Sequence, residues 1–435
     1  MTSDDNASLW NASARERFDA APLASEETVD LAVIGGGFTG CATALEAARM
    51  GASVLLLEAH RVAHGGSGRN VGLVNAGLWL PPETILRQMG EAEGKRLVEA
   101  LAAGPQLTFD VIAREGIDCE PVRAGTLHLA HASSGLDDLR DRFRQGNRLG
   151  APLQLLDDQE VARRTGSAAF HGALFDPRAG TVQPLSYCCG LARAAQEKGA
   201  RLCERSPVTS VAYRHGSWHL VANGHTVRAR ALLMAMNAYH ERLSTPLRPA
   251  FSTVHFSQYA TGPLSEAERA RILPGGEGCW DTALVMSSVR VDQSGRLILG
   301  GMGNADGPGA RIHRDWARRK LRELYPDLAE VGFTHSWQGK IAMTSDHIPK
   351  VVQVGPGGYA VFGYSGRGIA PGTVFGTAAA RALIEDRPDA FPLTVQGNYS
   401  ERITMIKSAY YEMGATLTHA IDGLRNAGRG HRDAE

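Results

Sequence analysis

Short apolar runs recur along the chain, separated by glycine-rich turns and by helical stretches. The run from Val29 to Ile34 precedes three glycines, an alanine-rich stretch from Phe38 to Met50 follows, and the run from Ser53 to Leu57 comes next. This order of strand, turn, helix and strand predicts a βαβ unit with parallel strands. Further strands are predicted at residues 208–213, 218–222, 231–236 and 359–363. Strands interspersed with helices are typical of an α/β fold.

A different pattern fills the regions between these strands. Amphipathic helical segments are predicted at residues 83–115 and 135–149, and several strands broken by turns at residues 251–301. We therefore expect a discontinuous α/β domain with a doubly wound parallel sheet, and a second, mixed domain inserted in two pieces. The expected boundaries are 28–82, 165–245 and 332–390 for the first domain, 83–164 and 246–331 for the second, 1–27 for an N-terminal extension and 391–425 for a C-terminal helical segment.

The composition is that of a globular protein with room for two cores. The chain has 435 residues, of which 43% are hydrophobic and 21% charged, and single cores stop growing at ~250 to 300 residues. The number of Lys and Arg residues (46) equals the number of Asp and Glu residues (46). The chain therefore lacks the excess of positive charge that would predict a nucleic acid partner. Residues 1–22 lack the pattern of a signal peptide, and no apolar run reaches ~18 residues, which predicts a cytoplasmic protein without a membrane span. The six cysteines have no metal-ligand spacing, and we expect reduced thiols and no metal site.

A glycine motif, Gly35-x-Gly37-x-x-Gly40, joins the first strand to the first helix. Glycines at these positions let the backbone turn tightly and approach a pyrophosphate, whose charge meets the N–H groups at the start of the helix. Glu58 ends the second strand about 20 residues later, where a carboxylate can hold ribose hydroxyls. Strand, motif, helix and acidic residue together predict a bound dinucleotide.

Two further glycine-rich loops favour a flavin over a nicotinamide. Residues 64–73 contain glycines that permit close approach to a flat ligand, together with the polar side chains Ser67, Arg69 and Asn70. Residues 363–368 lie between a predicted strand and a helix predicted from Pro371 to Ile384. The start of such a helix would stabilise the negative charge of a reduced flavin.

Several segments carry a more specific signal: Asp30 to Gly40, Ser67-Gly-Arg-Asn70, Met234-Ala-Met-Asn-Ala-Tyr239, Trp337-Gln-Gly-Lys-Ile-Ala-Met-Thr344 and Gly363-Tyr-Ser-Gly-Arg-Gly368. Together with Glu58, Asp346 and Pro349 they resemble FAD-dependent oxidoreductases of the D-amino acid oxidase superfamily, and within it the gamma-glutamylputrescine oxidoreductases. The similarity runs from about Leu9 to Tyr410.

The resemblance implies a p-hydroxybenzoate hydroxylase-like FAD domain, with the antiparallel sheet of a substrate domain covering the flavin. It also implies that a neutral amine gives a hydride from its carbon to flavin N5, that water hydrolyses the resulting imine, and that O2 or another acceptor reoxidises the flavin. Cofactor contacts are expected from the glycine-rich loops and the strand ends beside them: Gly35, Gly37, Phe38, Thr39, Gly40, Glu58, Ala59, Ser67, Gly68, Arg69, Asn70, Gly72, Leu73, Val208, Asn237, Gly363, Gly366, Arg367, Gly368 and Ile369.

Two positions depart from the pattern of related enzymes. Gly339 stands where sarcosine-oxidase-like members attach flavin through a cysteine, so we expect non-covalent FAD. Ile341 stands where glycine-oxidase-like members carry a carboxylate-binding arginine. An α-carboxylate would lose its bidentate partner, which favours a gamma-glutamyl polyamine or secondary amine, and a role in polyamine catabolism, over a free amino acid. Lys340 or Arg290 could still supply the charge from a neighbouring position.

The candidate catalytic residues are Arg69, whose charge would favour reduced flavin and oxygen-derived anions, and Lys340, which the resemblance places near the flavin. The expected walls of an amine pocket are aromatic, apolar and charged side chains: Trp79, His255, Tyr259, Trp280, Met286, Arg290, Trp337 and Tyr364. Three alternatives stay open, namely an oxidase of free amino acids such as sarcosine, glycine or a D-amino acid, a tRNA-modifying flavin module, and a flavin-binding protein without turnover.

Overall fold

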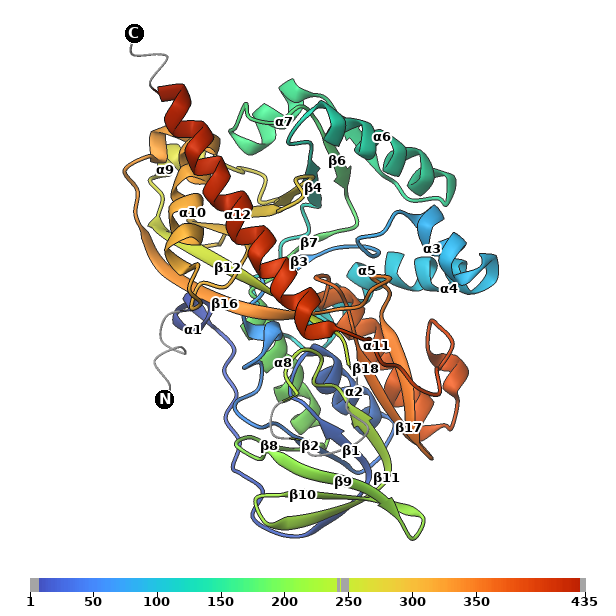
Figure 1. Cartoon of the computed structure of the whole chain (residues 1–435). Coiled ribbons are helices and arrows are strands. Elements are labelled where there is room, and N and C mark those ends of the chain that lie inside the picture. The colour runs from blue at the N-terminus through green and yellow to red at the C-terminus, as the bar shows by residue number, and fades with distance from the viewer. Residues whose placement is uncertain (1–7, 241–242, 244–249, 431–435) are drawn as a thin grey trace.

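Two large β-sheets lie one above the other, each with helices of its own (Figure 1). The computed structural model describes residues 8–240, 243 and 250–430, and the side chains of these residues up to residue 422. The first sheet occupies the lower half of Figure 1, and the second sheet occupies the upper half. No helix in the described part of the chain is long and apolar enough to cross a bilayer.

The first sheet has a parallel centre, as the βαβ pattern predicts. Its strands run in the order β17-β18-β11-β1-β2-β8, and β10 and β9 continue from β11 in antiparallel pairs. β1 pairs in parallel with β2 on one side and with β11 on the other, and open α/β sheets bind ligands at such a switch point. The strands are β1 Glu27–Ile34, β2 Val54–Leu57, β8 Arg201–Cys203, β9 Val208–Arg214, β10 Ser217–Ala222, β11 His225–Met234, β17 Lys350–Gly355 and β18 Gly358–Phe362.

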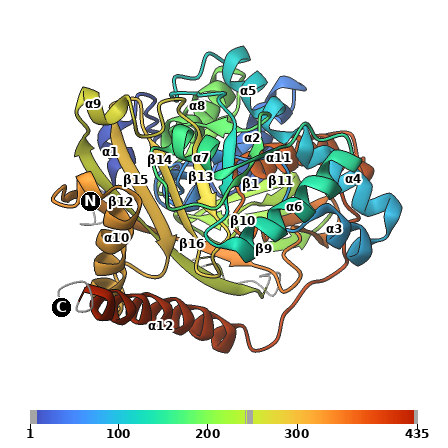
Figure 2. The same ribbon diagram turned by 90° about the horizontal axis from the view of Figure 1, so that it is seen from above.

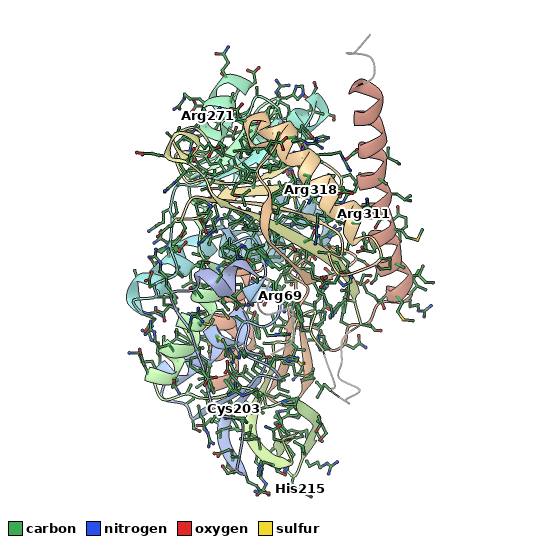
Figure 3. The ribbon with its side chains drawn as sticks, turned by 90° about the vertical axis from the view of Figure 1, so that its left-hand side faces the viewer. Arg69, Cys203, His215, Arg271, Arg311 and Arg318 are labelled. Atoms are coloured by element: carbon green, nitrogen blue, oxygen red, sulfur yellow. The ribbon has the colours of Figure 1, made fainter. Side chains whose placement is uncertain are left out.

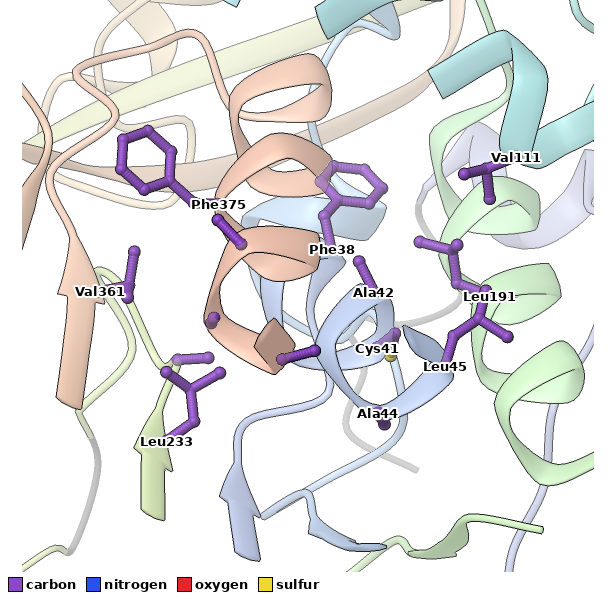
Figure 4. Close-up of a cluster of buried hydrophobic side chains, with 14 of the residues drawn as sticks. Phe38, Cys41, Ala42, Ala44, Leu45, Val111, Leu191, Leu233, Val361 and Phe375 are labelled. Carbon is purple, nitrogen blue, oxygen red and sulfur yellow. The ribbon is translucent and has the colours of Figure 1, made fainter. Parts of the chain in front are cut away.

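Side chains of β1 alternate between two cores, because successive residues of a strand point to opposite faces. Leu31 and Val33 belong to the helical core, which Figure 4 shows with Phe375 labelled. Ala32 and Ile34 pack instead with the apolar residues of β9 and β10. One face of the sheet is therefore covered by helices and the other by strands. The covering helices are α2 Phe38–Arg49, α8 Pro184–Glu197 and α11 Ile369–Ile384.

The second sheet is mostly antiparallel, as expected for the substrate domain. Its strands run in the order β16-β12-β15-β14-β13-β4-β6-β5, and only β13 and β4 pair in parallel among the described strands. One face packs against α10 in a core that contains Tyr259 and Trp316, and the other face turns toward the first sheet. The elements are β4 Thr126–Leu129, β5 Gln154–Leu156, β6 Ala173–Asp176, β12 Ser252–Pro263, β13 Gly278–Asp281, β14 Ser287–Val291, β15 Arg296–Met302, β16 Phe333–Met343 and α10 Ala310–Leu324.

Helix α12 (Thr404–Gly430) lies along the outside of the second sheet, where it contacts β12 and α10 (Figures 1 and 2). The two predicted amphipathic segments form α3 Pro82–Met89, α4 Glu91–Ala102, α5 Gly104–Arg114 and α6 Ser133–Arg148. The remaining elements are short: α1 Leu9–Ser13, α7 Asp158–Thr165, α9 Glu266–Arg269, the paired strands β3 Leu73–Val74 and β7 Gly180–Thr181, and the 3-10 turns η1 Gly66–Gly68, η2 Pro326–Leu328 and η3 Pro388–Ala390.

The expected domain boundaries differ from the sheets that the structure shows. β6 and β16 lie in segments expected in the first domain, yet both belong to the second sheet. Ile85, Leu101 and Phe109 lie in a segment expected in the second domain, yet they pack in the helical core of the first sheet. Pairing and packing between distant segments decide these memberships, and neither leaves a local signal in the sequence. The expected boundary between residues 245 and 246 lies outside the described residues.

Candidate functional site

A cavity of about 650 Å³ lies between the two sheets. Residues at the carboxyl ends of β1, β2 and β11 form one wall, and residues on the inner face of the second sheet form the other. The loops that precede β3 and α11 contribute further lining residues. The cavity therefore sits at the switch point of the first sheet, where α/β folds bind their ligands.

The start of α2 shapes one end of the cavity through its glycines. Gly35 has a φ of +108°, and a Cβ at this position would lie 2.9 Å from the Ala235 oxygen. A Cβ on Gly40 would lie 2.0 Å from the oxygen of Gly35. Only glycine fits at both positions, and residues 37–39 consequently border the cavity. The N–H groups and dipole of a helix start favour an anion such as pyrophosphate.

Glu58 follows β2 directly and lines the same end of the cavity. Its Oε2 accepts a hydrogen bond from Gly36 N at 2.7 Å, and its Oε1 accepts one from His60 N at 2.9 Å. Burial raises the pKa of Glu58, and the two backbone N–H groups oppose this effect. A carboxylate held in this way keeps lone pairs for the hydroxyls of a ribose.

The loop after β2 presents Ser67 and Asn70 to the cavity. Ser67 Oγ accepts a hydrogen bond from Phe38 N at 3.0 Å, which joins the loop to the start of α2. Asn70 Nδ2 donates to Gly66 O at 2.9 Å, which closes the loop on itself. These bonds make the loop a fixed part of the wall.

Arg69 belongs to the same loop but is not among the residues that line the cavity. Its Nε donates to His64 O at 2.8 Å, and its Nη1 donates to Gln338 O at 3.2 Å. The guanidinium therefore bridges the loop and β16, near the middle of the molecule (Figure 3). This placement gives Arg69 a structural role in holding the loop and does not support the direct flavin contact that we expected.

The loop between β18 and α11 lines the cavity with residues 366–369. Asn237 Oδ1 accepts a hydrogen bond from Gly363 N at 3.0 Å, and Tyr364 Oη lies 2.6 Å from Thr39 Oγ1. These bonds join the loop to the end of β11 and to α2. Asn237 has a φ of +44°, a conformation that a non-glycine residue keeps only where its surroundings hold it.

Most of the expected cofactor residues line the cavity: Gly35, Gly37, Phe38, Thr39, Glu58, Ala59, Ser67, Asn70, Leu73, Val208, Asn237, Gly366, Arg367, Gly368 and Ile369. The glycines Gly40, Gly68, Gly72 and Gly363 lie behind this wall, where an added Cβ would approach another atom to between 2.0 and 2.5 Å. Their role is therefore close backbone packing rather than the cofactor contact that we expected.

The alternation of β12 decides which of its side chains face the cavity. Val254, Phe256 and Gln258 line it, whereas His255 and Tyr259 do not. Tyr259 is buried in the core on the α10 side. His255 Nδ1 lies 3.7 Å from a carboxylate oxygen of Glu412 on α12. His255 and Tyr259 are thus corrected from pocket walls to the outer face of the sheet.

Trp337 and Arg290 also lie outside the cavity lining. Trp337 Nε1 donates to Arg69 O at 2.8 Å, and its ring packs edge-on against Trp10 at 5.6 Å. Arg290 is fully buried, its Nη1 donates to Val182 O at 2.7 Å, and burial lowers its pKa to about 10. Arg290 therefore cannot supply charge to a substrate, contrary to one of our expectations.

The other expected wall residues do line the cavity: Trp79, Trp280, Met286 and Tyr364. Lys340, an expected catalytic residue, lines it as well. Lys340 N donates to Tyr239 Oη at 2.9 Å, and its Nζ lies 5.7 Å from the centre of the Tyr239 ring. Lining residues that the sequence analysis did not single out include Arg142, Phe256, Gln258 and His347. Strand alternation in β12 could have indicated Phe256 and Gln258, whereas no sequence pattern pointed to Arg142.

The lining fits a flavin nucleotide in both shape and chemistry. Donors at the start of α2 suit a pyrophosphate, Glu58 suits a ribose, and the glycines of two loops admit a flat ring system. A Cβ on Gly339 would lie 2.3 Å from the ring of Phe256, so a cysteine does not fit there without moving that ring. All six cysteines are buried and none lines the cavity.

Comparisons with known proteins agree with this site. A model of the family described as FAD dependent oxidoreductase matches residues 30–382. The chain is 29% identical to probable oxidoreductase OrdL from Haemophilus influenzae, over 95% of this chain and 96% of that protein. It is also 29% identical to gamma-glutamylputrescine oxidoreductase from Escherichia coli, over 94% and 98% of the two chains.

The fold is similar to that of a solved flavoenzyme. The structure of glycine oxidase from Geobacillus kaustophilus matches with a TM-score of 0.68 and 23% identity, over 83% of this chain and 95% of that one. The two-domain FAD-binding fold is thereby confirmed. The chain belongs to the FAD dependent oxidoreductase family that includes D-amino acid oxidase, and its cofactor is FAD.

Proposed function

We propose that this protein oxidises a C–N bond of an amine of the gamma-glutamyl polyamine or secondary amine type, with FAD bound non-covalently. Bound FAD supplies the acceptor for a hydride from the amine carbon, and water then converts the imine to a carbonyl compound and a released amine. The near full-length similarity to gamma-glutamylputrescine oxidoreductase supports this class of substrate.

The observation that most directly supports this substrate class is the apolar and aromatic character of the cavity wall on the second sheet. Phe256 and Ile341 line it, and Met286 and Trp79 also line the cavity. Apolar and aromatic surfaces of this kind suit the aliphatic chain of an amine. Ile341 offers no charge to an α-carboxylate, and Arg290, the neighbouring candidate, is fully buried outside the lining.

Two side chains would act on the amine itself. Gln258 is buried, lines the cavity, and its Oε1 has no hydrogen-bond partner among the described residues, so it can accept a hydrogen bond from an amine N–H. Lys340 also lines the cavity. Its positive charge disfavours a protonated amine nearby, because like charges repel. Lys340 would therefore favour the neutral amine, which is the form that can lose a hydride.

The test is an anaerobic reduction of the flavin. The purified holoenzyme is mixed with gamma-glutamyl polyamines, free polyamines, N-methylated amines and both enantiomers of common amino acids, while the visible flavin band is followed. We expect rapid bleaching by the gamma-glutamyl or N-methylated amines and slow or no bleaching by free amino acids. If dithionite bleaches the band and no amine does, amine oxidation is excluded. If only free amino acids bleach it, the amino acid oxidase alternative replaces this proposal.

A further inference from the structure

Two arginines from distant parts of the chain line the cavity beside Trp280. Arg142 belongs to α6, and Arg367 belongs to the loop before α11. The guanidinium of Arg367 lies 5.1 Å from the centre of the Trp280 ring, and its Nη1 donates to Ala76 O at 2.8 Å. Arg142 Nη1 donates to Trp79 O at 2.8 Å. Main-chain oxygens thus hold both side chains in place and leave other N–H groups of each guanidinium for a ligand.

Positive charge exceeds negative charge at this end of the cavity. In the described part of the chain no carboxylate lies within 4.0 Å of Arg367, although Asp138 contacts Arg142 at 2.7 Å from a half-exposed position. Burial, followed by the charge of Arg142, lowers the pKa of Arg367 to about 9, so Arg367 stays protonated at pH 7. The charge of Asp176 raises the pKa of Arg367 in part, but this carboxylate is paired with Arg178 at 2.7 Å. A half-buried cation without a directly paired carboxylate is unfavourable. An anionic ligand would remove this imbalance.

The imidazole of His128 is influenced by both charges. His128 stacks on Trp280 with ring centres 4.9 Å apart. Its pKa lies well below the usual value, first because it is buried and then because of Arg142 and Arg367. His128 is therefore neutral and adds no charge, and the two guanidinium groups alone define an anion-binding corner beside an aromatic surface.

We propose that Arg142 and Arg367 together bind a carboxylate of the substrate, so that the preferred substrates are amines that also carry a carboxylate group. The inference rests on the proposed function and narrows it. Planar guanidinium forks match the geometry of a carboxylate. The missing arginine at position 341 is thus replaced, at a different place in the cavity, by a pair that serves a differently positioned carboxylate.

The first test measures binding without turnover. Pentanoate and the uncharged pentanamide are titrated into the holoenzyme, and the shift of the flavin band gives their dissociation constants. We expect pentanoate to bind at least 10-fold more tightly than pentanamide. Arg142→Gln should weaken pentanoate binding about 10- to 100-fold, because a hydrogen bond to a charged group contributes ~1.5–3 kcal/mol. Equal binding of acid and amide in the unmodified enzyme would overturn the proposal.

Arg140→Gln is the matched control for Arg142→Gln. Arg140 lies on the same helix, is largely exposed, and pairs with Asp137 at 2.9 Å, outside the cavity lining. The Arg140→Gln variant should leave the dissociation constant of pentanoate unchanged. Arg367→Gln should weaken pentanoate binding as Arg142→Gln does. A loss of FAD in Arg367→Gln, with pentanoate binding in Arg142→Gln unaffected, would show that these arginines do not form a carboxylate site.

The second test separates this inference from the proposed function. The flavin is reduced anaerobically with 4-(methylamino)butanoate and with its carboxamide. We expect the acid to act at lower concentration than the amide in the unmodified enzyme, and Arg142→Gln to remove this difference. Equal action of both compounds would keep amine oxidation and overturn the carboxylate site. If neither reacts, pentanoate binding alone decides whether the anion site exists.

Discussion

The two walls of the cavity are built from different parts of the polypeptide. The wall at the first sheet consists largely of main chain, with the glycines of the α2 start and of two loops at its surface. The wall at the second sheet consists of side chains, such as Phe256, Gln258 and Ile341, that project from paired strands. A main-chain wall is sensitive to any added atom, whereas a side-chain wall can change its surface while the strands stay in place. The first suits an invariant cofactor and the second suits a substrate that differs among relatives.

The largest effect should follow from adding one carbon to the main-chain wall. In Gly40→Ala the Cβ would lie 2.0 Å from the Gly35 oxygen, so α2 must shift away from β1. We expect a loss of stability of several kcal/mol, beyond the ~1–3 kcal/mol usual for overpacking, and protein that purifies without flavin. The measurement is the ratio of flavin to protein absorbance.

Gly332→Ala is the control for that variant, since a Cβ there meets no atom within 4 Å. It should keep a full complement of FAD. Normal flavin content in Gly40→Ala would show that the wall at the first sheet is less rigid than its geometry indicates.

The next largest effects are expected from substitutions on the two opposite faces of β12. Tyr259→Ala removes a fully buried ring from the core on the α10 side and should lower the free energy of unfolding by about 3–5 kcal/mol. Phe256→Ala removes a ring that lines the cavity, so we expect a smaller loss of stability and a larger change in substrate affinity. Chemical denaturation and anaerobic flavin reduction measure the two quantities. The opposite ranking of the two variants would mean that the faces of β12 have been assigned wrongly.

A smaller effect, on the affinity for FAD, is expected from a substitution of Glu58, whose side chain is bonded to the main chain of the wall at the first sheet. Glu58→Gln keeps the shape but removes the charge that accepts hydrogen bonds from Gly36 N and His60 N. We expect the dissociation constant of FAD to rise about 10-fold, because hydrogen bonds to charged groups contribute ~1.5–3 kcal/mol. Fluorescence of released flavin measures it. The exposed Glu26, outside the cavity lining, provides the control Glu26→Gln, and equal affinities in both variants would contradict the role of Glu58.

The smallest effect on the cavity is expected from the protonation of His419, which lies behind the second sheet. His419 of α12 stacks on Trp316 and faces His313, Arg319 and Glu412, and burial lowers its pKa to about 3. The unfolded chain, with an ordinary histidine pKa near ~6.5, binds this proton first. Stability is therefore complete above about pH 6.5 and decreases as the pH falls toward 3, by at most about 1.4 kcal/mol per pH unit for one proton.

Thermal unfolding between pH 4 and pH 8 tests this expectation, with His419→Phe as the variant that keeps a ring and removes the titration. The variant should have the flatter pH profile. Identical profiles would show that other groups control the acid sensitivity. The position and intensity of the flavin band should change little above the unfolding transition, because His419 does not line the cavity.

Sequence patterns predicted the main-chain wall well because its parts are local. The glycines of 35–40, Glu58 and the loop at 366–369 each follow a strand within a few residues, and all of them border the cavity or hold its wall. The side-chain wall was predicted less well. Arg69 and Trp337 have motif positions that resemble flavin enzymes, but their side chains bond to the main chain outside the cavity.

By itself, the sequence determined the βαβ unit, the flavin class of cofactor and the absence of an arginine at position 341, because strand periodicity, turn glycines and residue identity are local properties. The tertiary structure alone decided that β16 joins the second sheet, that Phe256 rather than Tyr259 faces the cavity, and that Arg142 and Arg367 line the same cavity. These facts depend on strand register and on contacts between segments far apart along the chain, where a shift of one residue reverses which side chains face the ligand.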